Sequence, residues 1–166
     1  MRGCLEPMST AAVLSIKPTY VNQILAGTKT IELRKSSMGL NQGDVILVYS
    51  SAPEQRLALW FQIKAIEVLS LSEMWSRHKD RLGISYEDYL EYFREVDLAF
   101  GFHIGDVHPL TSIPLDQIEE LVPGFVPPQG LIWLRDEVGR FERLLAQLST
   151  PLPRSVFPQQ SLMFDA

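Results

Sequence analysis

The sequence contains one cysteine, Cys4, so no disulfide can form within the chain. Its three histidines, His78, His103 and His108, do not combine with that cysteine in a spacing typical of zinc sites. No apolar run approaches the roughly 20 residues of a membrane span, and residues 1–10 hold no apolar stretch suited to a signal peptide. These absences predict a cytoplasmic protein with no membrane association, no bound metal and no cofactor.

An excess of positive charge is also lacking, since the formal net charge is −5 at pH 7. Such a chain is not expected to coat nucleic acid with its whole surface. Between residues 15 and 35, however, four positive side chains oppose one negative side chain, which gives a local balance of +3. The positive side chains are Lys17, Lys29, Arg34 and Lys35, and the negative one is Glu32. This small positive site suits a nucleotide or a short single strand better than a long duplex.

The stretch over residues 27–35 places charged and apolar side chains alternately in a segment that favours a β-strand. Strand alternation puts Glu32 and Arg34 on one face and Ile31 and Leu33 on the other. If the charged face lines a cleft, it offers a carboxylate beside a forked donor, which suits a polar planar ligand. The alternative is an exposed ion pair that contributes little.

The segments on both sides of this stretch predict a compact alternation of strands and helices. A strand over residues 11–17 leads into a helix that begins at Pro18 and ends at Gly27. The start of that helix lies beside Lys17, a natural place for an anion, although a helix end facing only solvent is the alternative. Further strands are expected over residues 45–49, 56–69, 98–104 and 131–133, and further helices over residues 70–82, 85–93, 114–121 and 134–148.

Several side chains within these elements allow two interpretations. The phase change in the strand over residues 56–69 predicts a bulge near Ala65. Trp60 either covers a second small core or offers a stacking platform, and His78 is expected to pack with the helical aromatics. Ser50 and Ser51, at the end of a buried strand, can hydrogen-bond a ligand or simply open a loop.

Three motifs together resemble the ASCH family of small PUA-like domains. They are Leu-Ser-Ile-Lys-Pro at residues 14–18, Gly-x-Lys-x-x-Glu-x-Arg at residues 27–34 and Pro-Pro-Gln at residues 127–129. The resemblance covers residues 13–134. It implies an α+β fold: a small, mostly antiparallel PUA-like β-barrel with flanking helices and a C-terminal amphipathic helix. The resemblance does not determine a single activity, because proteins that share one fold carry out several different functions.

As a binding module, such a domain would capture RNA, a nucleotide or a modified base in its cleft. Lys17, Lys29 and Arg34 would contact phosphate or acceptor edges. Glu32 would accept from an exocyclic amine, and Gln129 would bond a base edge.

The rival interpretation is a hydrolase of an amide or phosphodiester bond in a nucleoside or RNA, and a protein-interaction adaptor is a third. The family's N4-acetylcytidine amidohydrolases resemble this chain at Gly27 and Lys29, but they carry a catalytic threonine where this sequence has Glu32. Their catalytic glutamate falls within residues 67–73. In an enzyme, Lys29 would act as base or nucleophile and Glu32 would transfer protons. A third role for Glu32 is to neutralise a buried Arg34.

The ends of the chain are expected to lie outside the domain. We predict a disordered N-terminus over residues 1–10, the domain over residues 11–148 and a proline-rich tail over residues 149–166. The segment from Gln160 to Phe164 resembles the short peptides that dock on bacterial sliding clamps. Packing of this segment on its own domain is the alternative.

Overall fold

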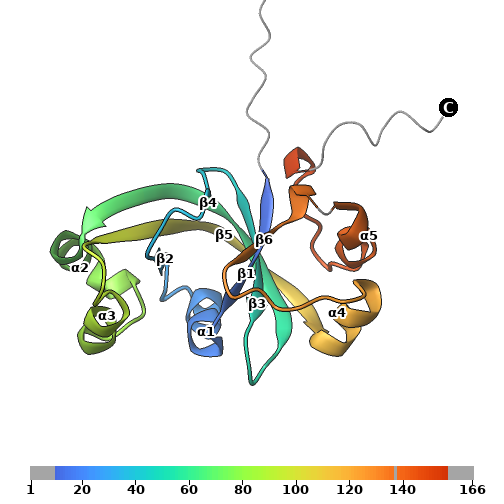
Figure 1. The fold of residues 1–166 in the computed structure, drawn as a ribbon, viewed down its shortest axis with the longest axis horizontal. Helices are drawn as coiled ribbons and strands as arrows, with labels where there is room; N and C mark the ends of the chain where they lie inside the picture. Colours follow the sequence, from blue (N-terminus) through green and yellow to red (C-terminus); the bar gives the residue numbers. More distant parts are fainter. Residues whose placement is uncertain (1–9, 137, 157–166) are drawn as a thin grey trace, which may run out of the picture.

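Two long neighbouring strands form the centre of the sheet (Figure 1). The computed structural model describes residues 10–136 and 138–156. β4 (Arg56–Ser70) and β5 (Leu98–Pro114) pair antiparallel over almost their whole length. Register shifts between residues 57 and 65 confirm the predicted bulge. β5 continues ten residues beyond the predicted end of its strand, because its second half pairs with the first half of β4.

The sheet has the strand order β2–β5–β4–β3–β1–β6. The other strands are β1 (Ala11–Ile16), β2 (Ile31–Arg34), β3 (Val45–Ser50) and β6 (Leu131–Trp133). β1 and β3 run parallel and the other pairs run antiparallel, which confirms the predicted α+β class with a mostly antiparallel sheet. Across the described residues the edge strands β2 and β6 do not pair, so the sheet is open and not a closed barrel.

Five α-helices flank this sheet in the described part of the chain, and three of them have the caps that the sequence signals predict. They are α1 (Pro18–Ala26), α2 (Leu71–His78), α3 (Tyr86–Tyr92), α4 (Leu115–Leu121) and α5 (Val138–Ala146). Gly27 ends α1 with a φ of 79°. The hydroxyls of Ser70 and Ser85 accept backbone N–H groups at the starts of α2 and α3. Among these described helices, each is too short to cross a membrane.

One hydrophobic core lies where α4 and α5 cover the sheet (Figure 1). Trp60 is buried there, its Nε1 donates to the carbonyl of Thr150, and its ring stacks on His108. Trp60 is therefore a packing residue, one of the two predicted roles, but the core that it fills is not a small one. Leu152 and Val156 are also buried in this core, so the described part of the proline-rich segment packs on the domain instead of extending away.

Two further cores bracket the region that holds the charged stretch. One lies between α1 and the sheet, and the other joins β2 to α2 and α3. Ile31 and Leu33 face the latter core, as their alternation predicts. His78 does not pack with the α2 and α3 aromatics as expected, because it points to Glu67 and His103 instead. The predicted peptide from Gln160 to Phe164 lies outside the described residues, as do residues 1–9.

Candidate functional site

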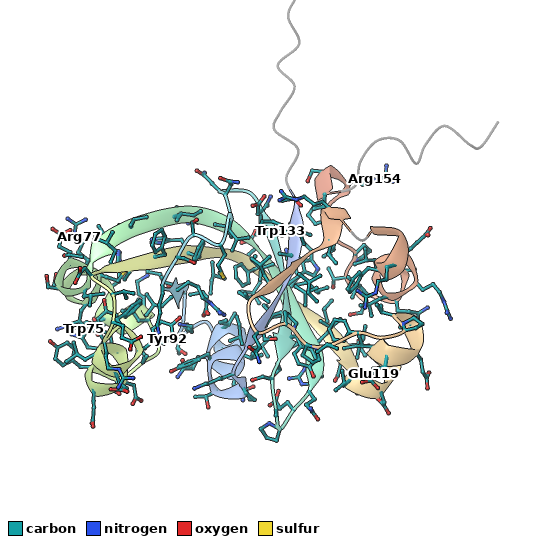
Figure 2. All side chains as sticks on the ribbon, in the orientation of Figure 1. Trp75, Arg77, Tyr92, Glu119, Trp133 and Arg154 are labelled. Carbon is teal, nitrogen blue, oxygen red and sulfur yellow. The ribbon has the colours of Figure 1, made fainter. Side chains whose placement is uncertain are left out.

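A cleft of about 490 Å³ lies between the core under α1 and the core that joins β2 to α2 and α3. It is found where α1, β2 and α3 meet. The end of β1 and the loop before α3 complete its wall. Figure 2 labels Tyr92 on the side of α3 that faces β2, and its hydroxyl lies 3.5 Å from the carbonyl oxygen of Leu33. The cleft is lined by Ser15, Ile16, Lys17, Tyr20, Lys29, Glu32, Leu33, Arg34, Ile84, Asp88, Glu91 and Tyr92.

The fold brings four of the predicted site residues together and leaves three outside. Lys17, Lys29, Glu32 and Arg34 all line the cleft, whereas Ser50, Ser51 and Gln129 do not. The hydroxyl of Ser50 is buried and donates to the carboxylate of Glu54 at 2.8 Å, Ser51 follows the end of β3, and Gln129 is exposed before β6.

Lys29 forms the floor of the cleft, with only 3% of its surface exposed. Its Nζ donates to the carbonyls of Ile31 and Leu82 at 2.8 and 2.7 Å. It also lies 5.1 Å from the ring centre of Tyr20 and 3.6 Å from Oε2 of Glu32. Burial lowers the pKa of Lys29, and the Glu32 carboxylate opposes that shift only in part. A lysine with a lowered pKa is suited to proton transfer.

Glu32 is buried and Arg34 is partly buried, so their ion pair is not an exposed one. Nε and Nη2 of Arg34 lie 3.1 and 2.9 Å from Oε1 of Glu32, and Nη2 also donates to the carbonyl of Ser15 at 3.1 Å. Glu32 thus stands between two basic side chains, those of Lys29 and Arg34. The Nη1 group of Arg34 takes no part in these three contacts.

The sequence did not reveal that α3 would contribute to this cleft. Asp88 and Glu91 from α3 offset two of the cations, so the lining holds three positive and three negative side chains. Burial, Asp88 and Glu32 raise the pKa of Tyr20, and burial raises the pKa of Tyr92. Both phenols therefore stay protonated at neutral pH.

The loop after α2 closes over Lys29 because Gly83 lets the backbone approach. Gly83 has a φ of 68°, and a Cβ there would meet the Gln23 side-chain oxygen at 2.1 Å and Cβ of Lys29 at 3.2 Å. This close approach brings the carbonyl of Leu82 within reach of Nζ.

Gly83→Ala is expected to lower the free energy of unfolding by about 1 to 3 kcal/mol, because both backbone strain and side-chain crowding oppose it. Chemical denaturation would measure the change. Gly124→Ala is the matched control, since Gly124 has a φ of 77° but a Cβ at that position would meet nothing within 4 Å. An equal loss in both variants would show that crowding around Lys29 has no effect.

Glu67, within the region where the resemblance implied a catalytic glutamate, does not line the cleft. It lies with His78 and His103, and these three residues could hold a metal ion. The cleft itself has lysine, arginine, tyrosine and carboxylate groups, an assembly suited to binding a polar anion and moving protons.

Comparisons with known proteins agree with this architecture. The family model of the ASCH domain matches residues 14–108. An ASCH domain-containing ribonuclease of Zymomonas mobilis is 31% identical over 131 residues, which cover 79% of this chain and 88% of that protein. The crystal structure of ASCH from Zymomonas mobilis has a TM-score of 0.77 at 29% identity, covering 86% of this chain and 99% of that one. The N-terminal domain of McrB from Staphylothermus marinus, 14% identical with a TM-score of 0.51, covers 85% and 96% respectively and shares the fold alone.

Proposed function

The chain belongs to the ASCH domain family, and we propose that its cleft binds single-stranded RNA and cleaves the phosphodiester chain. The Zymomonas mobilis relative named as a ribonuclease supports RNA as the substrate class. The cleft volume of about 490 Å³ falls in the range of small-ligand sites, which suits one nucleotide and its phosphate. A cleft with balanced charge does not suit a long duplex, whose binding depends on many cations.

The hydrogen bonding of Lys29 is the observation that carries the proposed cleavage. A neutral amine has two N–H groups, and the carbonyls of Ile31 and Leu82 accept two hydrogen bonds from Nζ. The lone pair is then left for a ligand proton, and Oε2 of Glu32, 3.6 Å from Nζ, would stabilise the ammonium group that forms. Because burial lowers the pKa of Lys29, the neutral form is easier to reach than for an exposed lysine. Lys29 therefore acts as the general base.

In the proposed reaction, Lys29 removes the proton of a ribose 2′-hydroxyl. The 2′-oxygen forms a bond to the adjacent phosphorus as the bond from phosphorus to the 5′-oxygen breaks. Tyr20, whose raised pKa keeps its phenol protonated, donates the proton to the departing 5′-oxygen. Nη1 of Arg34 contacts a non-bridging phosphate oxygen. The products are a 2′,3′-cyclic phosphate and a 5′-hydroxyl.

The cleft walls offer the means to hold a base beside this phosphate. Tyr92 and Tyr20 line opposite elements, α3 and α1, and unstacked bases commonly bind to aromatic faces. Asp88 and Glu91 can accept from exocyclic amines, a role that the sequence had assigned to Glu32.

A chimeric oligonucleotide tests the proposal. A DNA strand with a single ribonucleotide is expected to be cut only after that ribonucleotide, because the 2′-hydroxyl is the nucleophile. The all-DNA strand of the same sequence is the control and should remain intact. Mass spectrometry of the products should show the cyclic phosphate.

Cleavage of the all-DNA strand, or a product with a 5′-phosphate, would contradict this mechanism. Release of acetate from N4-acetylcytidine in the same preparation would favour the amidohydrolase alternative instead. Binding of the chimeric strand without cleavage would leave the domain as a recognition module and remove the catalytic part of the proposal.

A further inference from the structure

Outside the cleft, two histidines and a glutamate meet from three elements of the fold. Glu67 lies on β4, His78 ends α2 and His103 lies on β5. The Nε2 atoms of His78 and His103 lie 2.9 and 2.5 Å from Oε1 of Glu67. One ligand atom from each residue lies within 4.8 Å of the others. We propose that these three side chains bind a divalent transition-metal ion of the Zn²⁺ type.

The backbone explains why the three side chains share one face. Glu67 pairs with Gly101 across the β4–β5 ladder, and His103 follows two residues later on the same face. Gly101 has no side chain, and Met74 of α2 fills the space that a Cβ would take. His78 lies four residues after Met74, so it is on the same face of α2, the face that packs on β4 and β5.

The polar atoms of this group are not fully satisfied within the protein. Nε2 of His78 is buried and makes no aligned hydrogen bond, although it lies near the Glu67 carboxylate. The side chains of His78 and His103 are only 12% and 14% exposed. Buried polar nitrogen atoms almost always have a partner, and an ion between the three groups would supply one.

The chemistry of the three ligands fits a zinc-type ion. Two imidazole nitrogens and a carboxylate oxygen form the protein part of many open sites, with water at the remaining position. Ligands about 2.0 to 2.2 Å from zinc lie roughly 3.3 Å apart in a tetrahedron. Glu67 is 30% exposed, so a shift of its carboxylate toward solvent by less than about 1 Å makes room for the ion.

Titration of the metal-free protein with Co²⁺, a spectroscopic substitute for Zn²⁺, tests the site. All proteins carry Cys4→Ser, because a thiol also binds these ions. We expect one equivalent to bind with visible absorption bands, and one equivalent of Zn²⁺ to remove them. Zn²⁺ should also raise the melting temperature of this protein.

Three substitutions identify the ligands. His78→Gln and His103→Gln should each lower the affinity by about 100-fold or more, beyond the loss typical of an outer-shell partner. His108→Gln is the matched control and should bind as tightly as the parent, because His108 stacks on Trp60 outside the group. Glu67→Gln, at the most exposed of the three positions, provides a third ligand variant should either histidine variant fail to fold.

The proposal is overturned if the parent binds no ion at one equivalent. It is equally overturned if both histidine variants, or Glu67→Gln where they do not fold, retain the parent affinity. In either case the three side chains form a hydrogen-bonded group that only joins α2 to β4 and β5. Lys29→Met should leave Co²⁺ binding unchanged, which separates this site from the proposed cleavage.

Discussion

Glu32→Gln is expected to lower the free energy of unfolding by about 3 to 5 kcal/mol, because it leaves the partly buried Arg34 without its carboxylate. The guanidinium of Arg34 is 17% exposed, so water replaces little of the lost interaction. The loss of stability should appear in thermal and urea unfolding without any ligand. Of the three roles considered for Glu32, the geometry favours neutralisation of the partly buried Arg34.

The control for this prediction is an ion pair with solvent access. Glu73 lies 3.7 Å from Arg77 four residues later on α2, and both side chains are more than half exposed. Glu73→Gln should change stability by less than about 1 kcal/mol. If Glu32→Gln melts like the parent and only loses affinity for RNA, Glu32 is a recognition acceptor and not a structural anion.

Lys29→Met is expected to reduce the cleavage rate by about 10²- to 10⁴-fold, the usual loss when a general base is removed. Methionine keeps most of the volume of the side chain but has no group that accepts a proton. Single-turnover cleavage of the chimeric strand measures the effect apart from binding. Lys64→Met, an exposed lysine on β4, is the control and should cleave normally. A variant that retains the parent rate would remove Lys29 from the mechanism.

The same variant tests the lowered pKa of Lys29. Since that pKa lies below the ordinary value of 10.5, the unfolded chain binds more protons than the folded protein in the window between the two values. The stability of the parent relative to Lys29→Met should therefore rise as the pH increases through this window. Urea unfolding of both proteins between neutral and alkaline pH measures the difference. A difference that stays constant would show that Lys29 has an ordinary pKa.

Local patterns predicted most of the secondary structure because local energies determine it. Pro18 and Gly27 delimit α1, and the serine caps begin α2 and α3. The alternation in β2 correctly assigned its charged and apolar faces. The second half of β5 escaped prediction because its strand state depends on pairing with distant β4, and not on its own periodicity.

The site was predictable only for residues that lie close together in the sequence. Residues 15–35 supplied Lys17, Lys29, Glu32 and Arg34, but the acidic residues of α3 enter the cleft through tertiary packing. The same limit applies to Glu67, His78 and His103, which are separated by 11 and 25 positions in the sequence. Their spacing resembles no metal motif, and only the ladder register and the packing of α2 bring them together.

The segment after α2 is hydrogen-bonded to the residues at the floor of the cleft. The amide of Thr30 donates to the carbonyl of Arg81, Nε of Arg81 donates back to the Thr30 hydroxyl, and Lys29 donates to Leu82. The amide hydrogen of Thr30 can exchange with deuterium only when this segment opens. Such an opening also removes one carbonyl acceptor from the Lys29 amine. The exchange rate at Thr30 therefore reports the free energy of the opening that separates the Leu82 carbonyl from the Lys29 amine.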